Sequence, residues 1–150
     1  MKKNYIILIV LLLSTILVTL FLSRMYLTRK KETSSFYQES NKITVEELDE
    51  VSIEEPDVIY YISDKYNLDN ADFELKLKTK LEGKNLLNKL VYIDTNKTLI
   101  KKFKNIYKLN VNINKYPILV FVVDKKVIKT IYINDNQDID NYIDYGVYEW

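Results

Sequence analysis

The chain has 150 residues, of which 47% are hydrophobic and 29% are charged, values typical of a globular protein. The formal net charge is +1, so the overall charge does not favour nucleic acid as a partner. There is no cysteine and no histidine. This composition excludes disulfides, thiolate nucleophiles, imidazole bases and metal sites built from cysteine or histidine.

An uncharged, largely apolar run of 20 residues, Asn4 to Ser23, lies near the start of the chain. A helix of this length spans about 30 Å, the thickness of the hydrocarbon core of a bilayer. A cleaved signal peptide is the alternative, but its apolar core is normally shorter and ends in a small-x-small site, which Leu20–Arg24 lacks. We expect an uncleaved transmembrane anchor over residues 1–27 and a polar tether over residues 28–43.

The basic residues around this run are compatible with two opposite membrane topologies. Lys2 and Lys3 precede the run, and more basic residues follow it: Arg24, Arg29, Lys30 and Lys31. A positive-inside count therefore favours a cytoplasmic C-terminal part. A short basic start followed at once by a long apolar run instead resembles an uncleaved secretory signal. We favour this second interpretation, a single-pass protein of the cell membrane with an extracytoplasmic domain.

Residues 44–150 carry a succession of helix and strand patterns. Thr44 and Glu47 have the spacing of a capping box, which predicts a short helix that ends before Pro56. The continuous apolar run 58–62 is typical of a strand that is covered on both faces. A polar turn over 63–70 leads to a helix that Asp69 or Asn70 caps, and whose apolar stripe is formed by Phe73, Leu77 and Leu81.

Gly83 is expected to end this helix in the left-handed conformation. Residues 90–93 form a second strand of the buried type, and Thr95 or Asn96 caps the helix that follows. This helix has an apolar face and a largely opposite lysine face. We interpret the lysine face as solvated, because arginine is absent from it and the domain is nearly neutral.

Two apolar, β-branched runs, 118–123 and 127–132, flank the charged break 124–126 and predict an antiparallel hairpin. Pro117 stands at the entry to the first run, where a residue without an N–H is tolerated. The pattern of residues 135–145 predicts a terminal helix. The Asp and Asn residues at its start resemble a calcium loop only weakly, since the expected Gly is missing.

The predicted fold class is α/β, with the order helix, strand, helix, strand, helix, strand, strand, helix after the anchor. Alternation of strands and helices implies parallel pairing with crossovers, and the hairpin adds an antiparallel edge to a mixed sheet.

This order, with a proline at the entry to the third strand, resembles the thioredoxin fold over roughly residues 44–148. The segments 116–121 and 124–128 are similar to the thioredoxin segment in which a cis-proline opens a strand and a charged turn follows. The segment 57–63 resembles the strand that delivers the thioredoxin active site. More narrowly, the chain resembles membrane-anchored thioredoxin-like proteins of low-GC Gram-positive bacteria.

The chain departs from the thioredoxin family where that family carries its Cys-x-x-Cys motif. The corresponding segment, 63–70, has no sulfur, and thiol–disulfide exchange requires a thiolate. The chain is therefore expected to be a degenerate, redox-inactive member of the family, with no catalytic, cofactor-binding or metal-binding residues.

The resemblance implies a peptide-contacting edge beside the proline. We expect the following residues to border it: Tyr60, Asp64, Lys65, Tyr66, Asn67, Leu68, Tyr116 and Pro117. The predicted function is a membrane-anchored module that binds or scaffolds an unidentified protein or peptide partner, without cofactor or nucleic acid. Two alternatives stay open: an accessory factor for peptide or bacteriocin export, and a hydrolase based on acids or hydroxyls.

Overall fold

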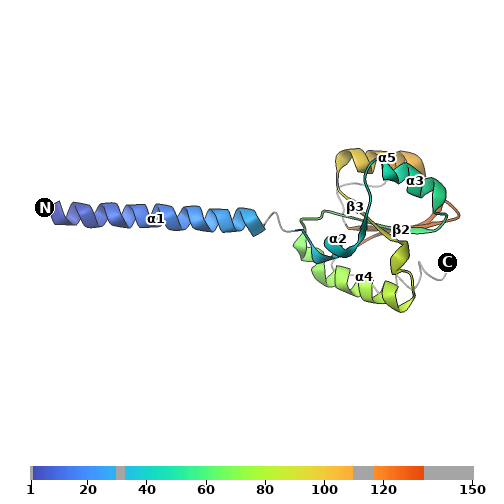
Figure 1. Ribbon diagram of the computed structural model, residues 1–150, viewed down its shortest axis with the longest axis horizontal. Coiled ribbons are helices and arrows are strands. Elements are labelled where there is room, and N and C mark those ends of the chain that lie inside the picture. The colour runs from blue at the N-terminus through green and yellow to red at the C-terminus, as the bar shows by residue number, and fades with distance from the viewer. Residues whose placement is uncertain (1, 30–32, 110–116, 134–150) are drawn as a thin grey trace. The chain divides into compact units, whose positions relative to one another are not determined.

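The computed structural model describes residues 2–29, 33–109 and 117–133 of the chain. The chain divides into two compact units, residues 1–32 and residues 33–150. The first unit contains α1 (Lys2–Arg29), one continuous helix. The second unit contains the mixed α/β fold (Figure 1).

Helix α1 is long and apolar enough to cross a membrane. The stretch Ile9–Tyr26 has a mean hydropathy of 2.0. Three hydroxyl side chains in this stretch bond to carbonyls of the same helix: Ser14 and Thr15 to Leu11 and Thr19 to Thr15, each at 2.8 Å. These bonds satisfy the hydroxyls without a partner outside the helix, as a span in hydrocarbon requires.

The described residues of the second unit form a five-stranded sheet with helices on both faces. Its strands are β1 (Asn41–Lys42), β2 (Val58–Ser63), β3 (Leu90–Asp94), β4 (Ile118–Val123) and β5 (Lys126–Tyr132). They lie in the order β1-β3-β2-β4-β5. Strand β3 runs parallel to both β1 and β2, whereas β4 is antiparallel to both β2 and β5.

The helices form two layers around this sheet (Figure 1). On one face lie α3 (Glu47–Glu54) and α5 (Lys97–Tyr107), and on the other lie α2 (Ser35–Glu39) and α4 (Ala71–Gly83). Two short 3₁₀ turns, η1 (Leu68–Asn70) and η2 (Leu87–Lys89), precede α4 and β3. Each layer buries its own apolar cluster, with Leu48 and Phe103 on the first face and Leu77 and Leu81 on the second.

Most predicted elements of the compact unit that fall in its described part are confirmed. The four apolar runs are strands, and the stripe on α4 is buried at Leu77 and Leu81. The capping box forms in both directions: the Thr44 N–H donates to Glu47 Oε2 at 2.8 Å, and the Glu47 N–H donates to Thr44 Oγ1 at 3.3 Å. The predicted terminal helix, 135–145, lies outside the described residues.

Both ends of helix α4 are capped differently from the prediction. The Asn70 side chain does not cap this helix and instead donates to Ser63 Oγ at 3.3 Å. Gly83 is the last residue of α4 and has no positive φ; Asn85 takes the left-handed conformation, with φ 59°. The Leu86 N–H then donates to the Leu81 carbonyl at 2.8 Å, which closes the helix end two residues later than Gly83 would have allowed.

The hairpin loop is one residue shorter than the predicted break. Val123 pairs with Lys126, so only Asp124 and Lys125 form the loop, and both have positive φ. Two residues with positive φ are the requirement of a type I′ turn. The Lys125 N–H donates to the Pro56 carbonyl at 2.9 Å, and this bond fixes a turn that lacks the usual glycine.

Part of the segment predicted as a tether, 28–43, belongs to the compact unit. Residues 33–42 contain α2 and β1, and the Phe36 side chain is 5% exposed within the apolar cluster of the α4 face. The Phe36 ring contacts the Tyr61 ring edge-on, with centroids 5.5 Å apart. A single helical turn is too short to show a period, so the pattern of this segment did not reveal its burial.

Removal of the Phe36 ring tests this placement. Phe36→Ala should lower the free energy of unfolding by about 3 kcal/mol, because it empties a buried aromatic site. Ile53→Ala is the matched control, since the Ile53 side chain is 65% exposed and its loss should change the value by less than about 0.5 kcal/mol. Urea unfolding followed by near-ultraviolet circular dichroism measures both. Equal effects of the two substitutions would show that residues 33–42 do not pack on the sheet.

Candidate functional site

The carboxyl ends of β2 and β3 bring two loops to the same edge of the sheet. Ser63 at the end of β2 pairs with Asp94 at the end of β3 in parallel register. Side chains that follow these strands therefore gather at one edge, the usual position of sites in sheets of this kind. The loop after β2 is Asp64–Leu68, the segment that the sequence predicts as part of a partner-binding edge.

Hydrogen bonds hold the backbone of this loop. Asp64 Oδ1 accepts from the Tyr66 N–H at 3.0 Å, and the Asp64 carbonyl accepts from the Asn67 N–H at 2.9 Å. Asn67 Oδ1 then accepts from the Asp69 N–H at 3.0 Å and caps η1. The loop is thus a set of local turns that presents the Tyr66 and Leu68 side chains, which are 45% and 44% exposed.

Lys65 connects the loop to the neighbouring strand end. Its Nζ lies 3.0 Å from Asp94 Oδ2, and its backbone N–H donates to Asp94 Oδ1 at 3.3 Å. The hydrogen bond to Asp94 raises the pKa of Lys65. The ammonium group also stands over the Tyr66 and Tyr37 rings, at 5.2 and 5.7 Å from their centroids. Lys65 is therefore a positioned cation at this edge.

Three more residues are predicted by the sequence to border this edge. Pro117 lies near the loop, Tyr60 does not, and Tyr116 lies outside the described part. Ile118 pairs with Ile62, so Pro117, which is buried, lies at the same end of the sheet as Ser63. Tyr60 is fully buried on the α5 face, where its hydroxyl lies 2.8 Å from that of Tyr107, so it does not border the edge. Tyr116, and with it the predicted cis bond to Pro117, lies outside the described residues.

Tyr60 is buried, and does not border the edge as predicted, because of the position of its strand. Strand β2 lies between β3 and β4, and all six of its residues are buried. The T-shaped contact of Tyr60 with Phe103, at 5.0 Å between centroids, fills the space beneath α5. A tyrosine in a central strand thus contributes to the core even though a residue only a few positions later is exposed.

Beneath the loop, on the α4 face, lies a buried polar cluster that the sequence pattern did not predict. It contains a carboxyl group and four hydroxyls: Ser34, Tyr61, Ser63, Glu74 and Tyr92. The Glu74 side chain is 2% exposed and its Oε1 accepts from the Tyr61 hydroxyl at 3.2 Å. The Tyr92 hydroxyl is buried without a hydrogen-bond partner among the described residues.

The position of Glu74 could have been found from spacing. Glu74, Leu77 and Leu81 share one face of α4, and all three are buried. An acidic residue in the first turn of a helix also interacts favourably with the helix dipole, so the residue type alone does not indicate burial. A glutamate in register with an apolar stripe is the signal for a buried acid.

Burial decides what this carboxyl group can do. Burial raises the pKa of Glu74 above 4.5, and hydrogen bonds from Ser34 and Tyr61 oppose the rise. Burial also raises the pKa of both Tyr61 and Tyr92. Within residues 33–109 and 117–133 no group of three or more acidic residues is placed to hold a metal ion. The side chains of the cluster are buried, so the cluster belongs to the interior of the compact unit.

Comparisons of the chain with protein-family models, curated proteins and solved structures found no match.

The raised pKa of Glu74 predicts a particular pH dependence of stability. The folded chain holds the Glu74 proton more tightly than the unfolded chain, so the stability contributed by this group is present below pH 4.5 and falls as pH rises through the folded-state pKa. Glu74→Gln stays neutral and keeps an acceptor for Tyr61. Relative to this variant, the wild-type protein should lose unfolding free energy as the pH rises above 4.5 and through the raised folded-state pKa.

Urea unfolding at several pH values measures the difference. Glu82→Gln, on the exposed side of the same helix, is the control and should give a curve parallel to the wild type. Parallel curves for Glu74→Gln and the wild type would contradict a raised pKa at Glu74.

Proposed function

We propose that the chain is a single-span membrane protein whose compact unit is a thioredoxin-like domain without redox activity, and that this domain binds a protein or peptide partner. It is not an enzyme in this proposal and uses no cofactor. The anchor is α1, and the domain is extracytoplasmic. The observation that carries the proposal is the solvent-exposed loop Asp64–Leu68 at the carboxyl end of the central strand, with Pro117 at the same end of the sheet.

The thioredoxin-like assignment is supported by strand direction. The parallel pair β2 and β3 is joined through α4, and the antiparallel hairpin β4–β5 begins directly after Pro117. These are the pairings that the resemblance implies. The chain has no cysteine at the position after β2 or anywhere else, so the domain cannot exchange disulfides.

The chemistry of the edge favours a polypeptide over a small substrate. An exposed tyrosine and leucine stand beside a lysine whose charge is held in place by Asp94. Aromatic and apolar anchors with a polar rim are typical of protein interfaces. The hydrolase alternative would need paired carboxylates of perturbed pKa in one cleft. Among the described carboxyl groups, burial raises the pKa of Glu74, which lies in the interior, whereas hydrogen bonds with Thr44 lower the pKa of Glu47 on α3. The two groups are therefore not a pair in one cleft.

The anchor is tested by membrane extraction. The full chain should stay in the membrane pellet through high salt and alkaline carbonate, and mass spectrometry should find residues before Asn4 still attached. Ile9–Tyr26 is the stretch that predicts this result. As a control, Leu12→Arg together with Leu17→Arg places two charges in the span and should reduce membrane retention. A soluble form cut near Ser23 would contradict an uncleaved anchor.

The partner edge is tested by site-specific crosslinking in the native membrane. A photoreactive side chain at Tyr66 should capture a polypeptide, because Tyr66 projects from the loop. The matched control is the same group at Leu75, which is 65% exposed on α4 but is no part of the edge. Lys65→Glu should then remove the Tyr66 adduct. Identical adducts at both positions, or none at Tyr66, would count against this loop as a binding surface.

A further inference from the structure

Strand β1 forms one edge of the sheet. It pairs with β3 through Asn41 and Lys42, and both of these residues are exposed. Among the described strands none lies on its other side. A very short edge strand that carries a lysine is one way in which proteins prevent unspecific pairing. Residues of β1 nevertheless line a groove on each face of the sheet.

On the α3 face, β1 borders a groove of about 450 Å³, here called the acidic groove. Its floor includes Val51 of α3 and Val58 at the start of β2. Its rim has four carboxyl groups: Glu47, Glu50, Glu55 and Asp57. A volume of this size accommodates one or two side chains of a peptide.

The charges of the acidic groove are only partly neutralised. Two lysines, Lys42 and Lys89, also line it, which leaves four acidic groups against two basic ones. Lys89 pairs with Glu55 at 3.5 Å, and the Lys42 ammonium donates to the Gln38 carbonyl at 2.9 Å. Glu50 has no ion pair or hydrogen bond with any described residue. The groove therefore offers a carboxylate to a cation from outside.

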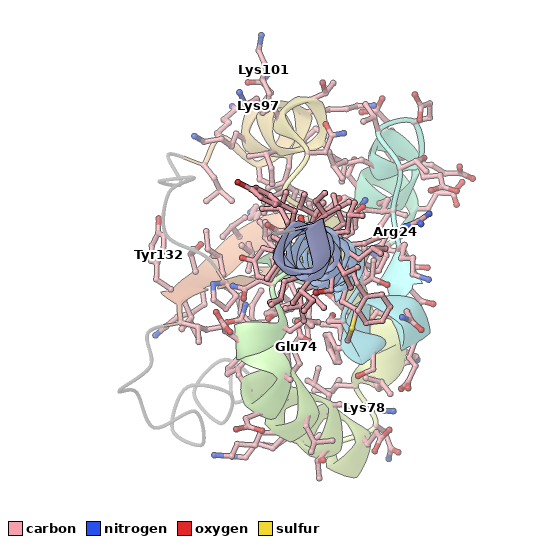
Figure 2. All side chains as sticks on the ribbon, turned by 90° about the vertical axis from the view of Figure 1, so that its left-hand side faces the viewer. Arg24, Glu74, Lys78, Lys97, Lys101 and Tyr132 are labelled. Atoms are coloured by element: carbon pink, nitrogen blue, oxygen red, sulfur yellow. The ribbon has the colours of Figure 1, made fainter. Side chains whose placement is uncertain are left out.

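On the opposite face, β1 borders a second groove of about 310 Å³, here called the apolar groove. Its apolar lining comes from Phe36, Leu87 and Leu90. The charged groups at its rim satisfy each other, since Lys78 Nζ lies 2.5 Å from Glu39 Oε2. Figure 2 labels Lys78 on α4, whereas Lys97 and Lys101 on α5 point away from the sheet on the other side of the molecule.

We propose that β1 accepts an extended segment of a partner polypeptide as an added strand, and that this segment alternates basic and apolar side chains. Successive side chains of a strand point to opposite faces of the sheet. The basic side chains would lie in the acidic groove and the apolar ones in the apolar groove. Backbone hydrogen bonds to β1 then supply affinity, and the two grooves supply specificity.

The negative charge of the acidic groove favours a partner polypeptide as its occupant over the protein's own C-terminal segment. Residues 134–150 carry five acidic residues and no basic one. Such a segment would be repelled by the acidic groove. Neither the loop Asp64–Leu68 nor α1 takes part in this binding, so strand addition at β1 can fail or hold independently of the function proposed above.

The test uses the full chain in zwitterionic nanodiscs and a fluorescein-labelled hexapeptide that alternates lysine and valine. Fluorescence anisotropy should show saturable binding, and empty nanodiscs should show none. A peptide that alternates glutamate and valine should bind at least about tenfold more weakly. A version of the lysine peptide with N-methylated backbone should lose binding, because it keeps every charge but cannot form the strand.

Charge reversal on α3 tests whether the peptide binds in the acidic groove. Glu50→Lys should weaken binding of the lysine peptide by about tenfold. Glu54→Lys is the matched control, because Glu54 is exposed on the same helix and does not line the groove, and it should change binding by less than about twofold. Glu50→Gln, with smaller loss expected, serves if the lysine variant does not fold by circular dichroism.

Four results would overturn the proposal, and the first three concern the peptides and variants. They are absence of saturable binding to the wild-type chain, equal weakening by Glu50→Lys and Glu54→Lys, and equal binding of the N-methylated peptide. A dimer of the chain that the peptide disperses, measured by mass photometry, would assign β1 to a second copy instead and would also overturn it.

Discussion

The burial of β2 is the constraint on which the compact unit depends. All six residues of Val58–Ser63 are buried, and the strand is hydrogen-bonded to β3 on one side and β4 on the other. A strand with no exposed face needs a helical layer above and below it, and these layers are α3 with α5 and α2 with α4. Because the backbone polar groups of β2 have no access to water, both neighbouring strands must be in place for it to be stable.

The alternation of side chains along β2 separates two kinds of core. Tyr60 points to the α5 face, where aromatic rings surround it and its hydroxyl pairs with that of Tyr107. Tyr61 points to the α4 face, where its hydroxyl donates to Glu74. An uncompensated buried carboxylate is unfavourable, and the hydroxyls of Tyr61 and Ser34 offset part of that unfavourable term. The α4 face of the sheet thus combines a polar cluster with an apolar one, and the polar cluster lies at the end of the sheet nearest the Asp64–Leu68 loop.

The strands and the faces of the helices could be predicted because burial leaves a periodic or continuous pattern. The run 58–62, the stripe through Leu77 and Leu81, and the capping box at Thr44 are local signals, and each is present in the structure. The elements that were missed are too short for such a signal: α2 has five residues and β1 has two. The burial of Glu74 is signalled by its register with Leu77 and Leu81, and the burial of Tyr60 by the continuous run 58–62. What the pattern does not give is which strand lies at the centre of the sheet, because that is a property of the assembled fold.

The segment Ser34–Lys42 contacts both ends of the sheet. Its packing therefore affects both of the proposed binding surfaces. At one end, the Ser34 N–H donates to the Lys65 carbonyl at 2.9 Å and so fixes the loop that carries Tyr66. At the other, Phe36 and Asn41 line the grooves beside β1. Between them, Phe36 and Tyr37 pack against Tyr92 of β3. A change in this segment would therefore reach both surfaces through packing alone, whereas Tyr66 and Glu50, which are exposed, give access to each surface separately.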